Sequence, residues 1–300
     1  MSMEENNFEK YIEAGRILTE SKAEVLKILR PGVKILEIAE FIEKKIVEKG
    51  GSPAFPVNIS IDDVAAHYTP ITGDMREIKD GEIVKIDLGV QVDGFIADSA
   101  VTYCSEKNIL VEAVEKSLEE VVKALKPGLE VREIADIIEG VTKEFGVGVI
   151  VNLTGHGLGQ YEFHAEPTVP NVKNNNTYKL EEGDVIAVEP FTCPTNGYVK
   201  ESGGICEIFR FVQEKPVRMP DTRKILEHIK NNFGPFPFAK RWLAKDFPAG
   251  KIAIALKQLE IAEVLERYPL LREVEGKKIA QAEHTVIIKE KPIVITKLSD

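Results

Sequence analysis

The strongest constraint on the fold is an internal repeat. Residues 29–50 read LRPGVKILEIAEFIEKKIVEKG, and residues 125–146 read LKPGLEVREIADIIEGVTKEFG. Each segment opens with a Pro-Gly turn, after which apolar residues recur at helical spacing. Two unrelated amphipathic helices with a shared loop type would give a similar pattern. The density of matches favours instead two equivalent turn-and-helix units.

The repeat continues into two strands that each end in a carboxylate. Residues 81–87 read GEIVKID and residues 183–189 read GDVIAVE, so Asp87 and Glu189 occupy equivalent positions. A period of roughly 100 residues is too long for a solenoid and predicts pseudo-twofold symmetry within one domain. We therefore expect two similar halves that face each other, each presenting an acid at the same place.

Residues 206–275 have no counterpart in the first half. Helical patterns over residues 222–232 and 252–267 flank a chain-breaking FGPFPF segment, and a strand is expected at 279–288. We interpret 206–275 as an inserted helical subdomain. Residues 1–205 and 276–300 would then form the main domain.

Two aspartates are predicted to share one face of a hairpin. Asp93-Gly94 is a strong two-residue turn signal, which would pair Val92 with Phe95 and place Asp98 opposite Gly89. Asp87 points to the same face, so the two carboxylates become diagonal neighbours roughly 5–8 Å apart. Gly89 is expected to leave space between them. A solvated face, or an edge strand guarded by charge, are the alternatives.

Histidines and glutamates complete the set of candidate ligands. Glycines on both sides expose His156, His164 follows eight residues later, and His67 lies in a small-residue loop before the hairpin. Glu189 ends one strand and Glu283 is central to another, where a buried carboxylate is costly unless it is paired or metal-bound. A buried salt bridge to Lys or Arg is the alternative for each glutamate.

Four carboxylates and one imidazole suit a pair of divalent cations. Oxygen ligands with a single nitrogen are typical of sites for Mn, Fe, Co or Zn. Four negative charges balance two dications, and carboxylates can bridge ions ~3.5–4 Å apart, as in two-metal hydrolases. The predicted metal ligands are Asp87, Asp98, His156, Glu189 and Glu283.

In this order and context, the residues resemble the ligands of the methionine aminopeptidase and prolidase superfamily. The resemblance implies an α+β "pita-bread" fold. The spacing between Glu189 and Glu283, which accommodates an insertion, is similar to that of type II methionine aminopeptidases of archaeal type. So are the segments Ala54-Phe-Pro56, Ala65-Ala-His-Tyr-Thr-Pro70, Gly155-His-Gly-Leu-Gly-Gln160 and Ala280-Gln-Ala-Glu-His-Thr285.

The resemblance also implies a role for each residue. Asp87 would chelate one ion, Asp98 and Glu283 would bridge both, and His156 and Glu189 would complete the second. A bridging hydroxide would then attack the carbonyl after an N-terminal methionine, with a small second residue preferred. Glu189 would also shuttle a proton, and His67 and His164 would hydrogen-bond the substrate and the intermediate. Phe55 and Tyr268 would wall the methionine pocket.

Composition narrows the cellular setting. The net charge of −10 disfavours a dedicated nucleic-acid binder, and the N-terminal residues lack the apolar core of a signal peptide. Three scattered cysteines fit a reducing compartment. We therefore expect a cytoplasmic monomer that acts on nascent chains, with transient ribosome contact left open.

Two other functions compete with the methionine aminopeptidase interpretation. One is an Xaa-Pro dipeptidase, which usually carries an additional N-terminal domain, and the other is a non-catalytic relative that binds ribosomes or RNA.

Overall fold

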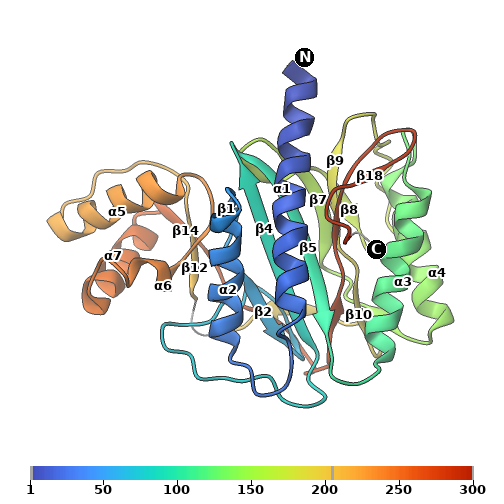
Figure 1. Ribbon diagram of the computed structural model, residues 1–300, viewed down its shortest axis with the longest axis horizontal. Coiled ribbons are helices and arrows are strands. Elements are labelled where there is room, and N and C mark those ends of the chain that lie inside the picture. The colour runs from blue at the N-terminus through green and yellow to red at the C-terminus, as the bar shows by residue number, and fades with distance from the viewer. Residues whose placement is uncertain (1–2, 204–205, 299–300) are drawn as a thin grey trace.

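The first half of the chain is a four-stranded antiparallel sheet covered by two helices (Figure 1). The computed structural model describes residues 3–203 and 206–298. In this sheet β4 pairs with β1 and β2 along one edge and with β5 along the other. The elements are α1 (Met3–Leu26), α2 (Ile35–Glu48), β1 (Ser52–Pro53), β2 (Asn58–Ile61), β3 (Val64–Ala66), β4 (Val84–Val92) and β5 (Phe95–Tyr103).

The second half has a five-stranded sheet in the order β18-β17-β9-β7-β8, packed against two further helices. Three short strands, β16, β10 and β6, form a separate small sheet. The elements are α3 (Ile109–Ala124), α4 (Val131–Glu144), β6 (Gly148–Val149), β7 (Thr154–Gly159), β8 (Glu162–Pro170), β9 (Val185–Val188), β10 (Phe191–Cys193), β11 (Val199–Glu201), β16 (Ala280–Gln281), β17 (His284–Ile287) and β18 (Ile293–Val294).

The two halves repeat each other down to single hydrogen bonds. Gly32 and Gly128 adopt the same left-handed conformation, with φ of 88° and 85°. The amide of Gly32 donates to the carbonyl of Ile78 at 2.8 Å, and that of Gly128 donates to Leu180 at 2.7 Å. The buried positions of the helices also correspond: Ile35, Ile38, Ala39, Ile42 and Ile46 in α2, and Val131, Ile134, Ala135, Ile138 and Thr142 in α4. The predicted internal repeat is therefore confirmed.

Most of the remaining elements (β12, α5, α6, α7 and β14) form a compact group beside the first half, at the left of Figure 1. Apolar side chains of α5, α7, β12 and β14 make a hydrophobic cluster of their own. A three-stranded sheet, β13-β12-β14, lies within this group, and β15 pairs with β11 and β3. The elements are β12 (Ile208–Phe211), α5 (Pro220–Phe233), β13 (Phe238–Ala239), α6 (Lys240–Leu243), α7 (Ala249–Ile261), β14 (Leu265–Tyr268) and β15 (Leu271–Glu273).

Two element boundaries differ from the sequence-based expectations. The helix expected over 252–267 ends at Ile261, because Glu263 takes a left-handed conformation with φ of 56° and the chain turns into β14. The strand expected over 279–288 is interrupted between β16 and β17. There the amide of Ala282 donates to Pro190 and that of Glu283 donates to Ala100, so both leave the regular ladder.

Two further features bear on the expected setting. Among the described residues, no helix combines the length and the apolar character that a membrane span requires. Cys104, Cys193 and Cys206 are all free thiols.

Candidate metal centre and substrate pocket

The β4–β5 hairpin places the first two carboxylates. Asp93 and Gly94 both have positive φ, at 51° and 88°, so the turn is the two-residue type that the sequence predicted. The register pairs Val92 with Phe95 and Gly89 with Asp98, which puts Asp87 and Asp98 on one face. Because β4 is paired on both sides, Asp87 does not guard an open edge.

The space beside Gly89 is filled, in contrast to the expectation of a gap between the aspartates. A β-carbon at Gly89 would clash with the ring of Phe55. This ring packs edge-on against Phe163, with centroids 4.9 Å apart. Gly89 therefore lets an aromatic wall approach the carboxylates closely.

The second half contributes the other three candidate ligands. His156 lies on β7, Glu189 follows β9 directly, and Glu283 lies in the break between β16 and β17. The interrupted strand still keeps alternate side chains on one face, since Gln281, Glu283 and Thr285 all face the hairpin. The Thr285 hydroxyl accepts from the Asp98 amide at 2.8 Å and donates to the Asp98 carbonyl at 2.7 Å.

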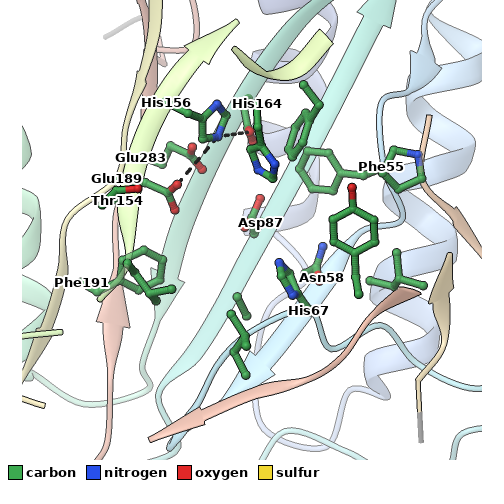
Figure 2. Close-up of a pocket in the computed structure, with 18 of the residues that line it drawn as sticks. Phe55, Asn58, His67, Asp87, Thr154, His156, His164, Glu189, Phe191 and Glu283 are labelled. Carbon is green, nitrogen blue, oxygen red and sulfur yellow. Dashed lines mark ion pairs between the residues drawn. The ribbon is translucent and has the colours of Figure 1, made fainter. Parts of the chain in front are cut away.

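These five side chains line one cavity, where Figure 2 labels Asp87, His156, Glu189 and Glu283. Ligand atoms of Asp98, His156 and Glu283 lie within 4.8 Å of one another. The Nε2 atom of His156 is 3.8 Å from both Asp98 Oδ2 and Glu189 Oε1, the two contacts drawn as dashed lines. The Gln281 amide bridges Asp87 and Glu189, at 3.4 Å from an oxygen of each.

The cluster crowds four carboxyl groups together with one buried cation nearby: Lys22 partly favours the charged form of Glu283, but its Nζ bonds Ser99 and the Thr296 carbonyl and forms no ion pair with any residue that the structure describes. Burial, reinforced by the neighbouring carboxylates, raises the pKa values of Asp98, Glu189 and Glu283 well above their usual range. Burial raises the pKa of Asp87 to about 7. Among the described residues, neither glutamate forms an ion pair with Lys or Arg. The salt-bridge alternative therefore fails for Glu189 and Glu283.

The donor set fits divalent cations. Asp87 Oδ1 and Asp98 Oδ1 are buried without hydrogen-bond partners, which is costly for carboxylate oxygens unless a cation meets them. His156 Nδ1 lies 3.0 Å from the carbonyl of Gly157, and a carbonyl can only accept, so Nδ1 carries the proton. Burial lowers the pKa of His156 to about 4, which leaves Nε2 as a free lone pair facing the carboxylates. This is the ligand form of histidine.

A cavity of about 230 Å³ adjoins the cluster. Every residue that the sequence singled out for substrate or metal lines it, and His67 and Tyr268 are 5.5 Å apart there as an edge-to-face pair. His164 on β8 stands edge-on to His156 at 4.6 Å. Sequence reasoning missed several other lining residues: Asn58, Phe163, Phe191, Ile208, Pro237 and Leu271. Phe163 adjoins the candidate His164 and could have been found from it, whereas Ile208, Pro237 and Leu271 lie far from every candidate residue in the sequence except Tyr268.

Comparison with known proteins identifies the fold and family. The sequence matches the model of metallopeptidase family M24 over residues 9–290. A solved structure described as a thermophilic Arx1 superposes with a TM-score of 0.85 at 21% identity, covering 100% of this chain and 92% of that one. Methionine aminopeptidase from Thermotoga maritima superposes with a TM-score of 0.68 at 22% identity, covering 97% of each chain. The chain therefore belongs to metallopeptidase family M24, and the predicted α+β pita-bread fold is confirmed.

A closer relative specifies the branch of that family. Methionine aminopeptidase from Thermococcus kodakarensis is 45% identical over 291 residues, which is 96% of this chain and 98% of that protein. At this identity and coverage the chain is placed among the methionine aminopeptidases. The resemblance inferred from the ligand pattern is confirmed. The family consists of metallopeptidases, which agrees with a divalent-metal site at Asp98, His156 and Glu283.

Proposed function

We propose that this chain removes the N-terminal methionine from polypeptides whose second residue is small. The observation that carries the proposal is the convergence of Asp87, Asp98, His156, Glu189 and Glu283 beside an aromatic-lined cavity. A volume of about 230 Å³ lies below the roughly 300–1,000 Å³ of sites for drug-sized ligands. It suits one side chain with its amino group better than the interior of a peptide.

Two divalent ions, of Co, Mn, Fe or Zn, are the proposed cofactors. The carboxylates of Asp87, Asp98, Glu189 and Glu283, together with His156 Nε2, would hold these ions. When bound, the ions would polarise the first peptide carbonyl and generate a nucleophile at neutral pH. Acidic oxygens around them also favour a free α-amino group over an internal amide.

The remaining polar residues would act on the substrate itself. His67 Nδ1 lies 3.1 Å from the carbonyl of Pro269. A carbonyl only accepts, so Nδ1 carries the ring proton and Nε2 is an acceptor. Burial lowers the pKa of His67, which keeps the ring neutral. His67 would therefore accept the N–H of the second residue. His164 would donate to the oxygen of the tetrahedral intermediate, and Glu189 would pass a proton to the departing amine.

Aromatic side chains would form the methionine pocket. Phe55 and Tyr268 lie on the cavity wall, with Phe163 packed against Phe55. A thioether contacts aromatic rings favourably, at about 0.3–1.5 kcal/mol per contact. This composition supports a preference for an unbranched, polarisable first side chain over proline or a charged residue.

The broader assignment follows the same proposal. We place the chain with the type II enzymes, with residues 206–275 as an insertion and 1–205 with 276–300 as the catalytic domain. The separate hydrophobic cluster of α5 and α7 supports that division. A cytoplasmic monomer acting on nascent chains, with transient ribosome contact, is the proposed setting.

The test is turnover by metal-free enzyme resupplied with each ion in turn. Methionyl-glycyl peptides should be cleaved and an Xaa-Pro dipeptide should not. Preferential cleavage of the Xaa-Pro substrate would replace the proposed activity with that of a dipeptidase. Absence of turnover with every ion would remove the catalytic assignment altogether and favour a binding relative.

A further inference from the structure

We propose that Arg241, on α6, is a positioning residue that sets the place of His67 in the substrate pocket, acting through Thr69. The inference rests on the proposed function, because it concerns how His67 meets the substrate. If so, the elements from β12 to β14, which include α6, contribute to the reaction by holding a substrate-binding residue in position.

His67 is held in a backbone conformation that it would not adopt unaided. Its φ is +63°, in the left-handed region, which is unfavourable for a residue with a β-carbon. Such conformations persist only where the surroundings fix them, and they cluster at functional sites. One restraint is visible at the ring itself, where Nδ1 donates to the Pro269 carbonyl at 3.1 Å and Tyr268 packs edge-on.

The second restraint lies two residues further along the chain, at Thr69. Its hydroxyl is buried, donates to the carbonyl of Val57 at 2.8 Å and accepts from Arg241 Nη1 at 2.6 Å. Val57 adjoins Asn58, which lines the cavity. Thr69 therefore links the His67 loop to the segment that leads into β2, and Arg241 holds the Thr69 hydroxyl in place by a second hydrogen bond.

Arg241 itself is locked in place. Its side chain is 4% exposed, and Nη2 pairs with Glu43 of α2. The other oxygen of Glu43 accepts from Trp242 Nε1 at 2.9 Å, and its first oxygen also accepts from the Val57 amide at 3.3 Å. One buried ion pair thus joins α6, α2 and the two chain segments that flank the pocket. A buried, forked guanidinium can hold three partners in fixed directions, which a lysine cannot.

The metal ligands lie outside this network. Arg241 contacts Glu43, Thr69 and Pro70, and none of the five candidate ligands. Loss of the network should therefore displace His67 and leave metal affinity unchanged. A purely structural ion pair would instead lower stability with no selective effect on the chemical step.

The experiment compares Thr69→Val with Thr69→Ser and Arg241→Met with Trp242→Phe in the metal-loaded full chain. Thr69→Val removes the hydroxyl at constant shape, whereas Thr69→Ser keeps it. Trp242→Phe loses a bond to Glu43 but leaves the Arg241–Thr69 contact. We expect kcat for a methionyl peptide to fall tenfold to a hundredfold in Thr69→Val and Arg241→Met, because a displacement of about 1 Å can cost ~10²-fold. KM should stay within threefold, and both control variants should keep near-normal kcat.

Two further readouts separate this inference from the proposed function. Calorimetric affinity for Mn²⁺ should be unchanged within twofold in all four variants. The ring nitrogen signals of His67 in NMR spectra should shift or broaden in Thr69→Val and Arg241→Met but not in the controls. Unchanged kcat with lowered thermal stability would overturn the positioning role. If the wild-type chain cleaves no methionyl peptide, the proposed function fails, and unchanged His67 signals would then overturn the inference independently.

Discussion

A missing β-carbon at Gly89 brings an aromatic wall against the carboxylates, and the same feature makes the position fragile. The ring of Phe55 occupies the place that a side chain would need. Gly89→Ala should therefore force Phe55 outward, costing about 1–3 kcal/mol of stability and raising KM for a methionyl peptide. Gly140→Ala is the matched control, because nothing lies near its would-be β-carbon in α4. That control should gain about 0.5–1 kcal/mol. Equal stability of the two variants in urea denaturation would contradict the packing argument.

Asp98 is the most enclosed of the aspartates in the described part of the chain, and it has an oxygen without a partner. Asp98→Asn removes one charge from a crowded, desolvated cluster while keeping the side-chain shape. We expect metal affinity to fall at least a hundredfold in calorimetry, because a proposed bridging ligand is lost. The metal-free protein should melt at a higher temperature than wild type, since one repelling charge is gone. Asp93→Asn, in the exposed turn of the same hairpin, removes only a surface ion pair with Lys10, so it should leave metal affinity unchanged and change stability by at most about 1 kcal/mol. Wild-type metal affinity in Asp98→Asn would remove Asp98 from the ligand set.

At the scale of elements, the paired Pro-Gly turns allow a symmetric test of the internal repeat. Gly32 and Gly128 have nearly equal positive φ, and nothing lies within reach of a β-carbon at either. Alanine at each position should therefore cost only backbone strain, about 1–2 kcal/mol. The two costs should be equal and should add in the double variant, because the sites lie in different halves. Denaturant unfolding measures all three. Clearly unequal costs would mean that the turns are not equivalent.

Elements whose conformation is determined by residues within the same segment could be predicted from the sequence. The hairpin register followed from Asp93-Gly94 alone, because a two-residue turn leaves a single pairing. The repeated helices followed from turn glycines and apolar spacing. The break at Glu283 could not be foreseen, because its cause is distant: the partners of residues 282 and 283 are Pro190 and Ala100. The same holds for Phe55 beside Gly89, and for the early end of α7, where a left-handed residue at Glu263 has no obvious sequence signal.

The site itself was partly predictable for a related reason. Carboxylates in apolar strands stand out in a sequence because their burial demands compensation, so the candidate ligands were visible as anomalies. Apolar wall residues such as Ile208 and Leu271 look like any core residue, and only the fold brings them to the cavity. Arg241 was missed because the sequence does not distinguish an exposed arginine on a surface helix from an arginine buried in an ion pair.

Across the whole molecule, the candidate ligands come from both halves: Asp87 and Asp98 from one, His156 and Glu189 from the other. Bound ions would therefore link the two halves, and chelation should weaken that junction first. Each site occupied at about 100 times its dissociation constant adds ~2.7 kcal/mol. We expect chelation to lower the melting temperature and to speed hydrogen exchange in β5, β9 and β17. The cluster around α5 and α7 packs separately and should keep its protection. Asp98→Asn, already poor in metal, should respond little to the chelator. Uniform loss of protection across all elements, or loss confined to α5 and α7, would contradict a metal link between the halves.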